Sequence, residues 1–116
     1  SQKPRTIVSA VRVLTSDLLI VLIHVPSENW QDAVARYDTT RVFEGRATIL
    51  PGYRQQLHDT MIDVIDVRTG SVLARARTAG RAVLTSDGTL YKSTVSDEGV
   101  IRVEAYEIVF RGLDAR

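Results

Sequence analysis

The feature that most constrains the fold is a β-hairpin signal at residues 61–77. A run of apolar and β-branched residues at 61–67 is followed by the short sequence Arg68-Thr69-Gly70 and by a second extended segment at 71–77. In the second segment small apolar residues alternate with arginines, as in a strand with one face toward a core. Glycine in the last loop position suits the left-handed backbone that such hairpin loops require. Residues 61–77 therefore predict two antiparallel strands joined by a tight turn.

The rest of the chain supplies five more segments of strand composition. They are residues 6–14, 18–25, 81–85, 89–95 and 100–110. The second of these is almost unbroken in its hydrophobicity, which indicates a strand buried on both faces. The last is expected to be the longest. The fold class predicted is all-β and antiparallel, with seven strands in about two β-propeller-like units and one inserted short helix.

A change of period predicts that helix at residues 28–37. Apolar side chains from Trp30 to Tyr37 fall at helical spacing, and a serine suited to cap a helix precedes them. Residues 38–56 have no stable period and contain two glycines and a proline, so we expect a long loop, in which 46–50 could form a short strand.

Composition restricts the class of protein. With 116 residues the chain is expected to be a single domain, 1–116. Fifteen basic and 14 acidic residues are scattered along it, so no basic face for nucleic acid is predicted. The longest apolar run, 18–23, is too short to cross a membrane as a helix, and residues 1–5 are too short and polar for a secretory signal. We expect a soluble chain with no membrane partner and no localisation signal.

An internal repeat accompanies the strand pattern. The sequence Val13-Leu-Thr-Ser-Asp17 recurs as Val83-Leu-Thr-Ser-Asp87, each copy ending one strand and opening the next. Without the helix and loop of roughly 30 residues, the offset leaves a period of about 40, the length of a four-stranded propeller blade. The chain then divides into a blade-like unit at 6–78, with an insertion at 27–57, and an incomplete one at 81–110.

Three stretches carry a resemblance to a known family. Residues 59–75, 84–90 and 96–106 resemble the final blades of bacterial six-bladed β-propeller proteins of the NHL-like kind, in which an Asp-x-x-Thr-Gly turn joins two strands in each blade. The resemblance implies blade architecture and transfers no catalytic residue. The chain departs from the family because it supplies under two blades, whereas a closed ring needs at least four.

This departure predicts an uncovered surface. An incomplete set of blades leaves apolar faces and a free strand edge at 100–110. We expect the chain to form a homo-oligomer, to be part of a larger propeller, or to close its two units face to face. A further alternative is one curved sheet wrapped around the helix with an internal pocket.

Candidate catalytic residues are few. There is no cysteine, and the two histidines, His24 and His58, lack metal-ligand spacing, so neither a metal site nor a cofactor is predicted. His24 is expected to be a hydrogen-bonded core residue. His58 and Asp59 are neighbours in sequence and would point to opposite faces of a strand, so they do not predict a catalytic dyad. Asp66 is expected to cap the turn before Gly70, rather than to form an acid–base pair with Asp63.

The function predicted is that of a non-catalytic binding or assembly module that acts through a strand edge or blade face. The alternative is a small-molecule or carbohydrate-binding protein, which could be an enzyme, that uses the loop at 38–58 and the helix aromatics. The ligand-binding residues expected in that case are Trp30, Tyr37, Tyr53, Arg54 and His58.

Overall fold

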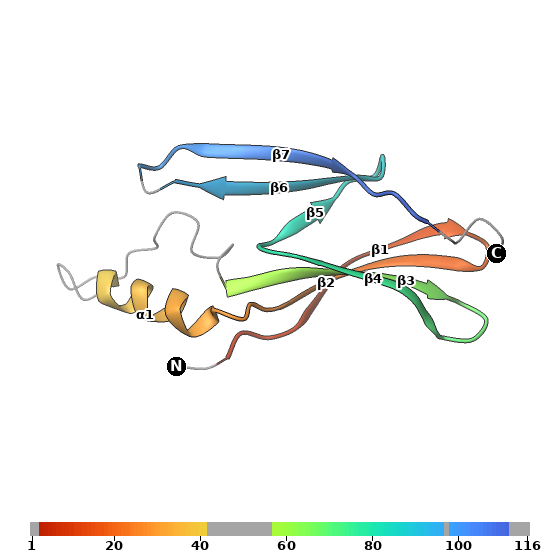
Figure 1. Cartoon of the computed structure of the whole chain (residues 1–116), viewed down its shortest axis with the longest axis horizontal. Helices are drawn as coiled ribbons and strands as arrows, with labels where there is room; N and C mark the ends of the chain where they lie inside the picture. Colours follow the sequence, from red (N-terminus) through yellow and green to blue (C-terminus); the bar gives the residue numbers. More distant parts are fainter. Residues whose placement is uncertain (1–2, 42–56, 97, 112–116) are drawn as a thin grey trace.

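Two antiparallel sheets make up the protein (Figure 1). The computed structural model describes residues 3–41, 57–96 and 98–111. One sheet has the order β1-β2-β3-β4 and the other the order β5-β6-β7, so within each sheet the strands lie in the order of the sequence. The elements are β1 (Ile7–Thr15), β2 (Leu18–Pro26), α1 (Trp30–Arg41), β3 (His58–Asp66), β4 (Val72–Thr78), β5 (Ala82–Leu84), β6 (Thr89–Val95) and β7 (Ile101–Glu107).

The predicted all-β, antiparallel class is confirmed: the described residues form four strands followed by three, with one helix inserted between β2 and β3. The alternative of a single curved sheet around the helix is wrong, because the strands form two separate sheets. In Figure 1, α1 extends beyond one end of the four-stranded sheet.

The predicted boundaries need two corrections. β7 ends at Glu107 and has seven residues, so it is not the longest strand; β1, β2 and β3 each have nine. It stops there because Ile108 and Phe110 leave the ladder and pack against the core. The helix begins at Trp30, since the Asn29 carbonyl accepts hydrogen bonds from the backbone of the first turn. The possible strand at 46–50 lies outside the described residues.

The hairpin signal is confirmed by the geometry of its turn. Gly70 has φ +74°, and its backbone N–H donates to the Asp66 carbonyl at 2.8 Å. The Asp66 carboxylate accepts the Arg68 backbone N–H at 2.9 Å, which is the capping role expected from the sequence. β3 and β4 consequently leave the turn as paired strands.

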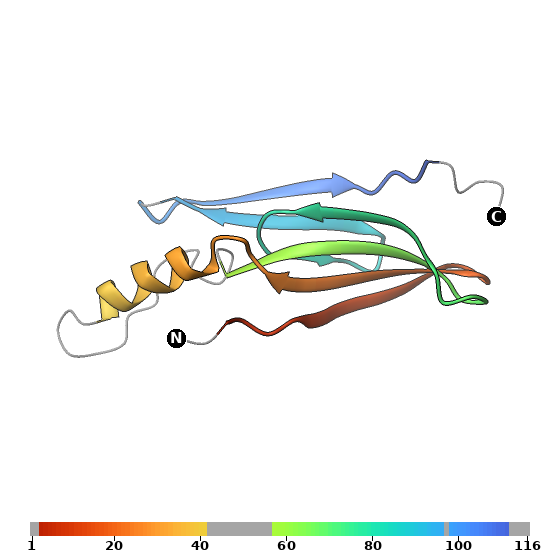
Figure 2. The same cartoon turned by 60° about the horizontal axis from the view of Figure 1, so that its bottom comes forward.

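The two sheets stack through their inner faces, with a small core between them (Figure 2). β2 is central in its sheet and is buried along most of its length, as its hydrophobicity predicts. The core cluster contains Ile20, Leu22, Ala82, Leu84 and Leu90, with Ala10, Ile62, Ile108 and Phe110 packed against it. Leu22 is fully buried and lies at its centre.

A set of hydrogen bonds joins the sheets at one end of this core. The Thr60 hydroxyl donates to the Gly80 carbonyl and accepts the Ala82 backbone N–H, both at 2.8 Å. His24 Nε2 donates to the Ala82 carbonyl at 3.0 Å, which confirms the expected core histidine. The segment that leads into β5 is therefore fixed to the first sheet by directional bonds as well as by apolar contact.

The core is small for the surface that the chain presents. The accessible surface is 7995 Å², whereas a compact monomer of 12.9 kDa would expose about 6,300 Å². The excess of about 1,700 Å² agrees with the elongated dimensions of 58 × 28 × 19 Å. Much apolar side-chain area thus stays in contact with water.

Candidate functional site

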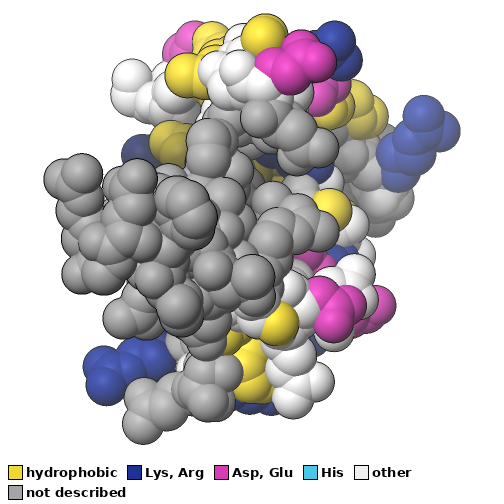
Figure 3. Space-filling model, turned by 90° about the vertical axis from the view of Figure 1, so that its left-hand side faces the viewer, with side chains coloured by type: hydrophobic (Ala, Val, Ile, Leu, Met, Phe, Trp, Pro, Cys, Tyr) yellow, Lys and Arg dark blue, Asp and Glu magenta, His cyan; other side chains and the backbone are white. Residues whose placement is uncertain are grey.

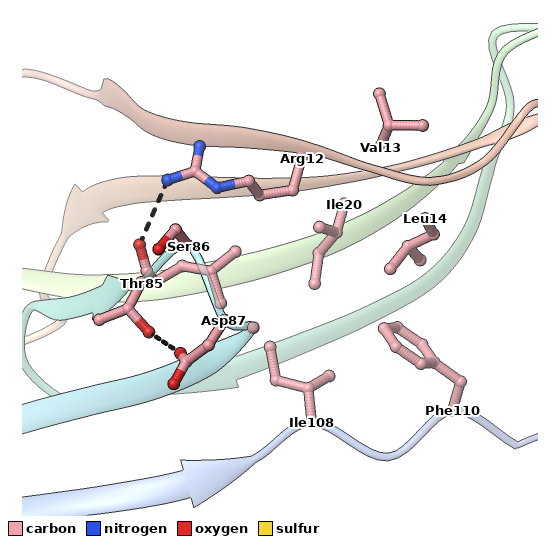
Figure 4. Close-up of a pocket in the computed structure, with 11 residues that line it drawn as sticks. Arg12, Val13, Leu14, Ile20, Thr85, Ser86, Asp87, Ile108 and Phe110 are labelled. Atoms are coloured by element: carbon pink, nitrogen blue, oxygen red, sulfur yellow. Dashed lines mark hydrogen bonds between the residues drawn. The ribbon is translucent and has the colours of Figure 1, made fainter.

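The two copies of the repeated sequence meet at a pocket between the sheets (Figure 4). Val13 and Leu14 line it from the end of β1, and Leu84 to Gly88 line it from the end of β5. β1 and β5 lie beside each other, and each is the first strand of its sheet. The repeat thus marks equivalent places in the two sheets.

The pocket has an apolar floor and a polar rim. Ile20, Ile108 and Phe110 lie on the apolar side, and Arg12 donates from Nη2 to the Leu84 carbonyl at 3.5 Å. Its volume of about 250 Å³ is below the roughly 300–1,000 Å³ typical of small-molecule sites. The lining residues include no histidine and a single carboxylate, that of Asp87.

The carboxylate of Asp87 has a structural role. It accepts hydrogen bonds from the Thr85 hydroxyl and from the Thr89 backbone N–H, and these donors lower the pKa of Asp87. A carboxylate held ionised by its own turn is a poor proton donor. Asp87 therefore serves the turn between β5 and β6.

His58, one of the predicted ligand-binding residues, lies in a different setting from the one expected. It is the first residue of β3 rather than part of the loop, and only 3% of it is exposed. Nε2 donates to the Arg5 carbonyl at 2.8 Å, and Nδ1 accepts from the Arg81 guanidinium at 3.1 Å. Arginine only donates and a carbonyl only accepts, so the ring is held neutral with its proton on Nε2.

The electrostatics of His58 agree with this arrangement. Burial lowers its pKa from the usual 6.5, the Arg5 carbonyl opposes this, and the charges of Arg81 and His24 lower the pKa further. The two imidazole rings lie 6.3 Å apart, centroid to centroid. No group of three or more potential metal ligands occurs in the described part of the chain.

The other predicted ligand-binding residues that fall in the described part of the chain lie in α1. Trp30 is half-buried at the start of α1, and Tyr37 lies within the same helix. Tyr53 and Arg54 fall in 42–56, outside the described residues.

The two strand aspartates have separate partners. Asp63 is buried and accepts two hydrogen bonds of 2.7 Å from Arg75 on β4, one to each oxygen. Asp66 caps the hairpin turn on the other face of β3. The expectation that they form no acid–base pair agrees with this geometry.

The free edge of β7 is the most prominent unfilled feature. The hairpin between β6 and β7 closes with the Ser96 N–H donating to the Val100 carbonyl. Hydrogen-bonded pairs alternate in antiparallel strands, so residues 100, 102, 104 and 106 bond toward β6. The backbone N–H and C=O groups of Ile101, Val103 and Ala105 therefore point away from the sheet. β7 forms the upper margin of the molecule in Figures 1 and 2, and all seven of its residues are exposed.

The side chains of the same sheet place apolar groups on its outer face. Ala82, Leu84 and Leu90 point inward to the core, so the alternate positions point outward. The apolar residues of the outer face are Val83, Tyr91, Ile101, Val103 and Ala105, of which the first, third and fourth are 58%, 68% and 63% exposed. Ser93 and Glu107 lie on the same face. Figure 3 shows hydrophobic and charged side chains side by side at the end of the molecule that carries the β6–β7 turn. Contiguous exposed apolar area of this kind is typical of interaction surfaces.

The outer face of the four-stranded sheet is apolar along β1. Val8, Val11 and Val13 share that face with Leu19, Val21 and Ile23 of β2, and the three β1 valines are exposed. The other half of the same outer face is charged, because Asp63 of β3 and Arg75 of β4 form an ion pair there.

Comparison with known proteins adds no further assignment. The chain matches no protein-family model, and no curated protein or solved structure is significantly similar to it. None of the helices in 3–41, 57–96 and 98–111 has the length and apolar character needed to cross a bilayer.

Sequence reasoning identified the β7 edge but missed two features. The first is the polar contact of His58 with Arg81, because the two residues are 23 positions apart and no local pattern connects them. The second is the pocket beside β1 and β5, although the repeated pentapeptide was a usable signal for it.

Proposed function

We propose that the protein is a non-catalytic, β-propeller-like assembly module that associates with further sheets through the β7 edge and the outer faces. The observation that carries this proposal is that, among the described residues, β7 has a strand edge without a partner beside exposed apolar side chains on the outer face of its sheet and along β1. Strand addition at such an edge supplies main-chain hydrogen bonds, and the flanking face supplies apolar burial.

The topology supports the blade-like part of the proposal. Each sheet is a simple meander, as in a propeller blade, and the first strands β1 and β5 are adjacent, as the innermost strands of neighbouring blades are. The second sheet has three strands where the first has four. A fourth strand from elsewhere would complete it.

The area supports association as well. The excess accessible surface of about 1,700 Å² is larger than the area of about 800 Å² that each partner buries in a standard protein–protein interface. The chain therefore has enough surplus surface for at least one interface of standard size.

Size-exclusion chromatography with light scattering, over a wide range of concentration, tests the proposal. We expect association that weakens in Val103→Lys, which places a charge on the outer face at the edge. The matched control, Val67→Lys, makes the same change at an exposed position in the turn between β3 and β4 and should leave association unchanged. A monomer that binds the dye ANS exposes apolar surface. That result would support the alternative in which the other blades of a longer propeller cover this surface. A monomer that shows no dye binding, with both variants unchanged, would refute the proposal.

A further inference from the structure

The side chains of β7 make this edge complementary to itself. In antiparallel pairing between two copies, the outward backbone groups of Ile101, Val103 and Ala105 must pair with one another. The two strands can therefore pair in only a few registers. In each register a two-fold axis passes through one residue of β7. The charges on the inner face then distinguish among them.

One register satisfies every position from Ile101 to Ala105. Centred on Val103, it places Arg102 of each copy opposite Glu104 of the other, so that two ion pairs form on the inner face. On the outer face Val103 lies opposite itself, and Ile101 opposite Ala105. Within this stretch the outer-face contacts are then apolar and the inner-face charges of β7 are paired. Glu107, at the end of the strand, lies opposite Gly99.

The neighbouring registers are disfavoured by charge. Centring on Arg102 places the two Arg102 side chains opposite each other, and centring on Glu104 does the same for the two carboxylates. Like charges directly opposite in a sheet are destabilising. In the registers centred on Ile101 or on Ala105, neither Arg102 nor Glu104 faces a residue of the other charge. The sequence of β7 therefore selects a single two-fold pairing.

We propose that two copies of the chain pair antiparallel through β7, centred on Val103, to form a continuous six-stranded sheet. This inference rests on the proposed function and specifies its partner as a second copy. The outer faces of the two three-stranded sheets join into one apolar surface, and the edge that would otherwise invite open-ended pairing is closed.

Charge reversal tests the register. Arg102→Glu places the new carboxylate of each copy opposite Glu104 of the other, and Glu104→Arg places two arginines opposite each other. Each single variant should raise the dimer dissociation constant by roughly 10- to 100-fold, as two attractive pairs become repulsive. Mixing the two variants should restore a dimer that contains one copy of each, and the double variant Arg102→Glu/Glu104→Arg should dimerise with itself.

Matched control variants show whether weaker dimerisation comes from the pairing of β7, from the change in net charge or from a loss of folding. Lys3→Glu and Glu28→Arg make the same charge changes at exposed positions away from β7 and should leave the dimer unchanged. Glu104 also accepts a hydrogen bond of 2.9 Å from the Tyr106 hydroxyl. The melting temperature of each variant is therefore measured at concentrations where it is monomeric, and recovery in the mixture shows that the singles are folded.

The outcomes distinguish the register from the assembly function. Dimers that form equally well in both single variants would overturn the β7 register and leave the assembly function standing. A wild-type chain that stays monomeric at every concentration would overturn the two-copy pairing, and its dye binding would then decide the proposed function. Dimers restored in the mixture and in the double variant would establish the register.

Discussion

Removing the Thr60 hydroxyl should weaken the junction between the two sheets, because this group makes hydrogen bonds that the volume of the side chain does not replace. Thr60→Val keeps the volume of the side chain and removes an atom that serves both as donor to Gly80 and as acceptor from Ala82. Thr60 and Ala82 have no exposed surface, so water does not replace both bonds. Each buried group left without a partner costs about 1–3 kcal/mol, which gives a loss of about 2–6 kcal/mol for the pair.

Thermal unfolding followed by circular dichroism measures this loss, at a concentration low enough to exclude association. For a domain of this size each kcal/mol lowers the melting temperature by about 4–8 °C, so Thr60→Val should melt roughly 10 °C or more below the wild type. Thr60→Ser is the matched control, because it keeps the hydroxyl and loses only a methyl group, worth about 1 kcal/mol. A valine variant as stable as the serine variant would refute the role given to this hydroxyl.

Three further changes test other parts of the structure. Because the pKa of His58 is lowered by burial, the unfolded chain binds the proton first, and stability should fall as the pH drops below about 6.5; a His58→Gln variant should show a shallower loss in denaturant titrations across that range. Gly70→Ala should lower the free energy of unfolding by about 1–2 kcal/mol, since φ is +74° and no atom lies within 4 Å of the added methyl group; an unchanged denaturation midpoint would contradict the turn geometry. Val103→Pro should leave the melting temperature of the monomer nearly unchanged and abolish association, because the N–H of Val103 points away from the sheet. Arg102→Pro should unfold the β6–β7 hairpin, because the N–H of Arg102 points into the sheet. An equal loss of circular dichroism signal in both variants would contradict the assignment of the free edge.

The sequence by itself determined the features that depend on neighbouring residues. Alternation and β-branching located the seven strands of the described residues. Gly70 identified the hairpin turn, which needs a residue with positive φ. The repeated pentapeptide marked the first strand of each sheet. These signals are readable because side-chain direction in a strand follows a period of two and turn chemistry is local.

Only the tertiary structure decided which distant groups meet. It made His58 the buried first residue of a strand against Arg81, and it stopped β7 at Glu107 so that Ile108 and Phe110 could reach the core. It also decided which face of the second sheet is covered. Strand periodicity marks two faces without saying which one meets a partner, since that depends on how sheets distant in sequence stack.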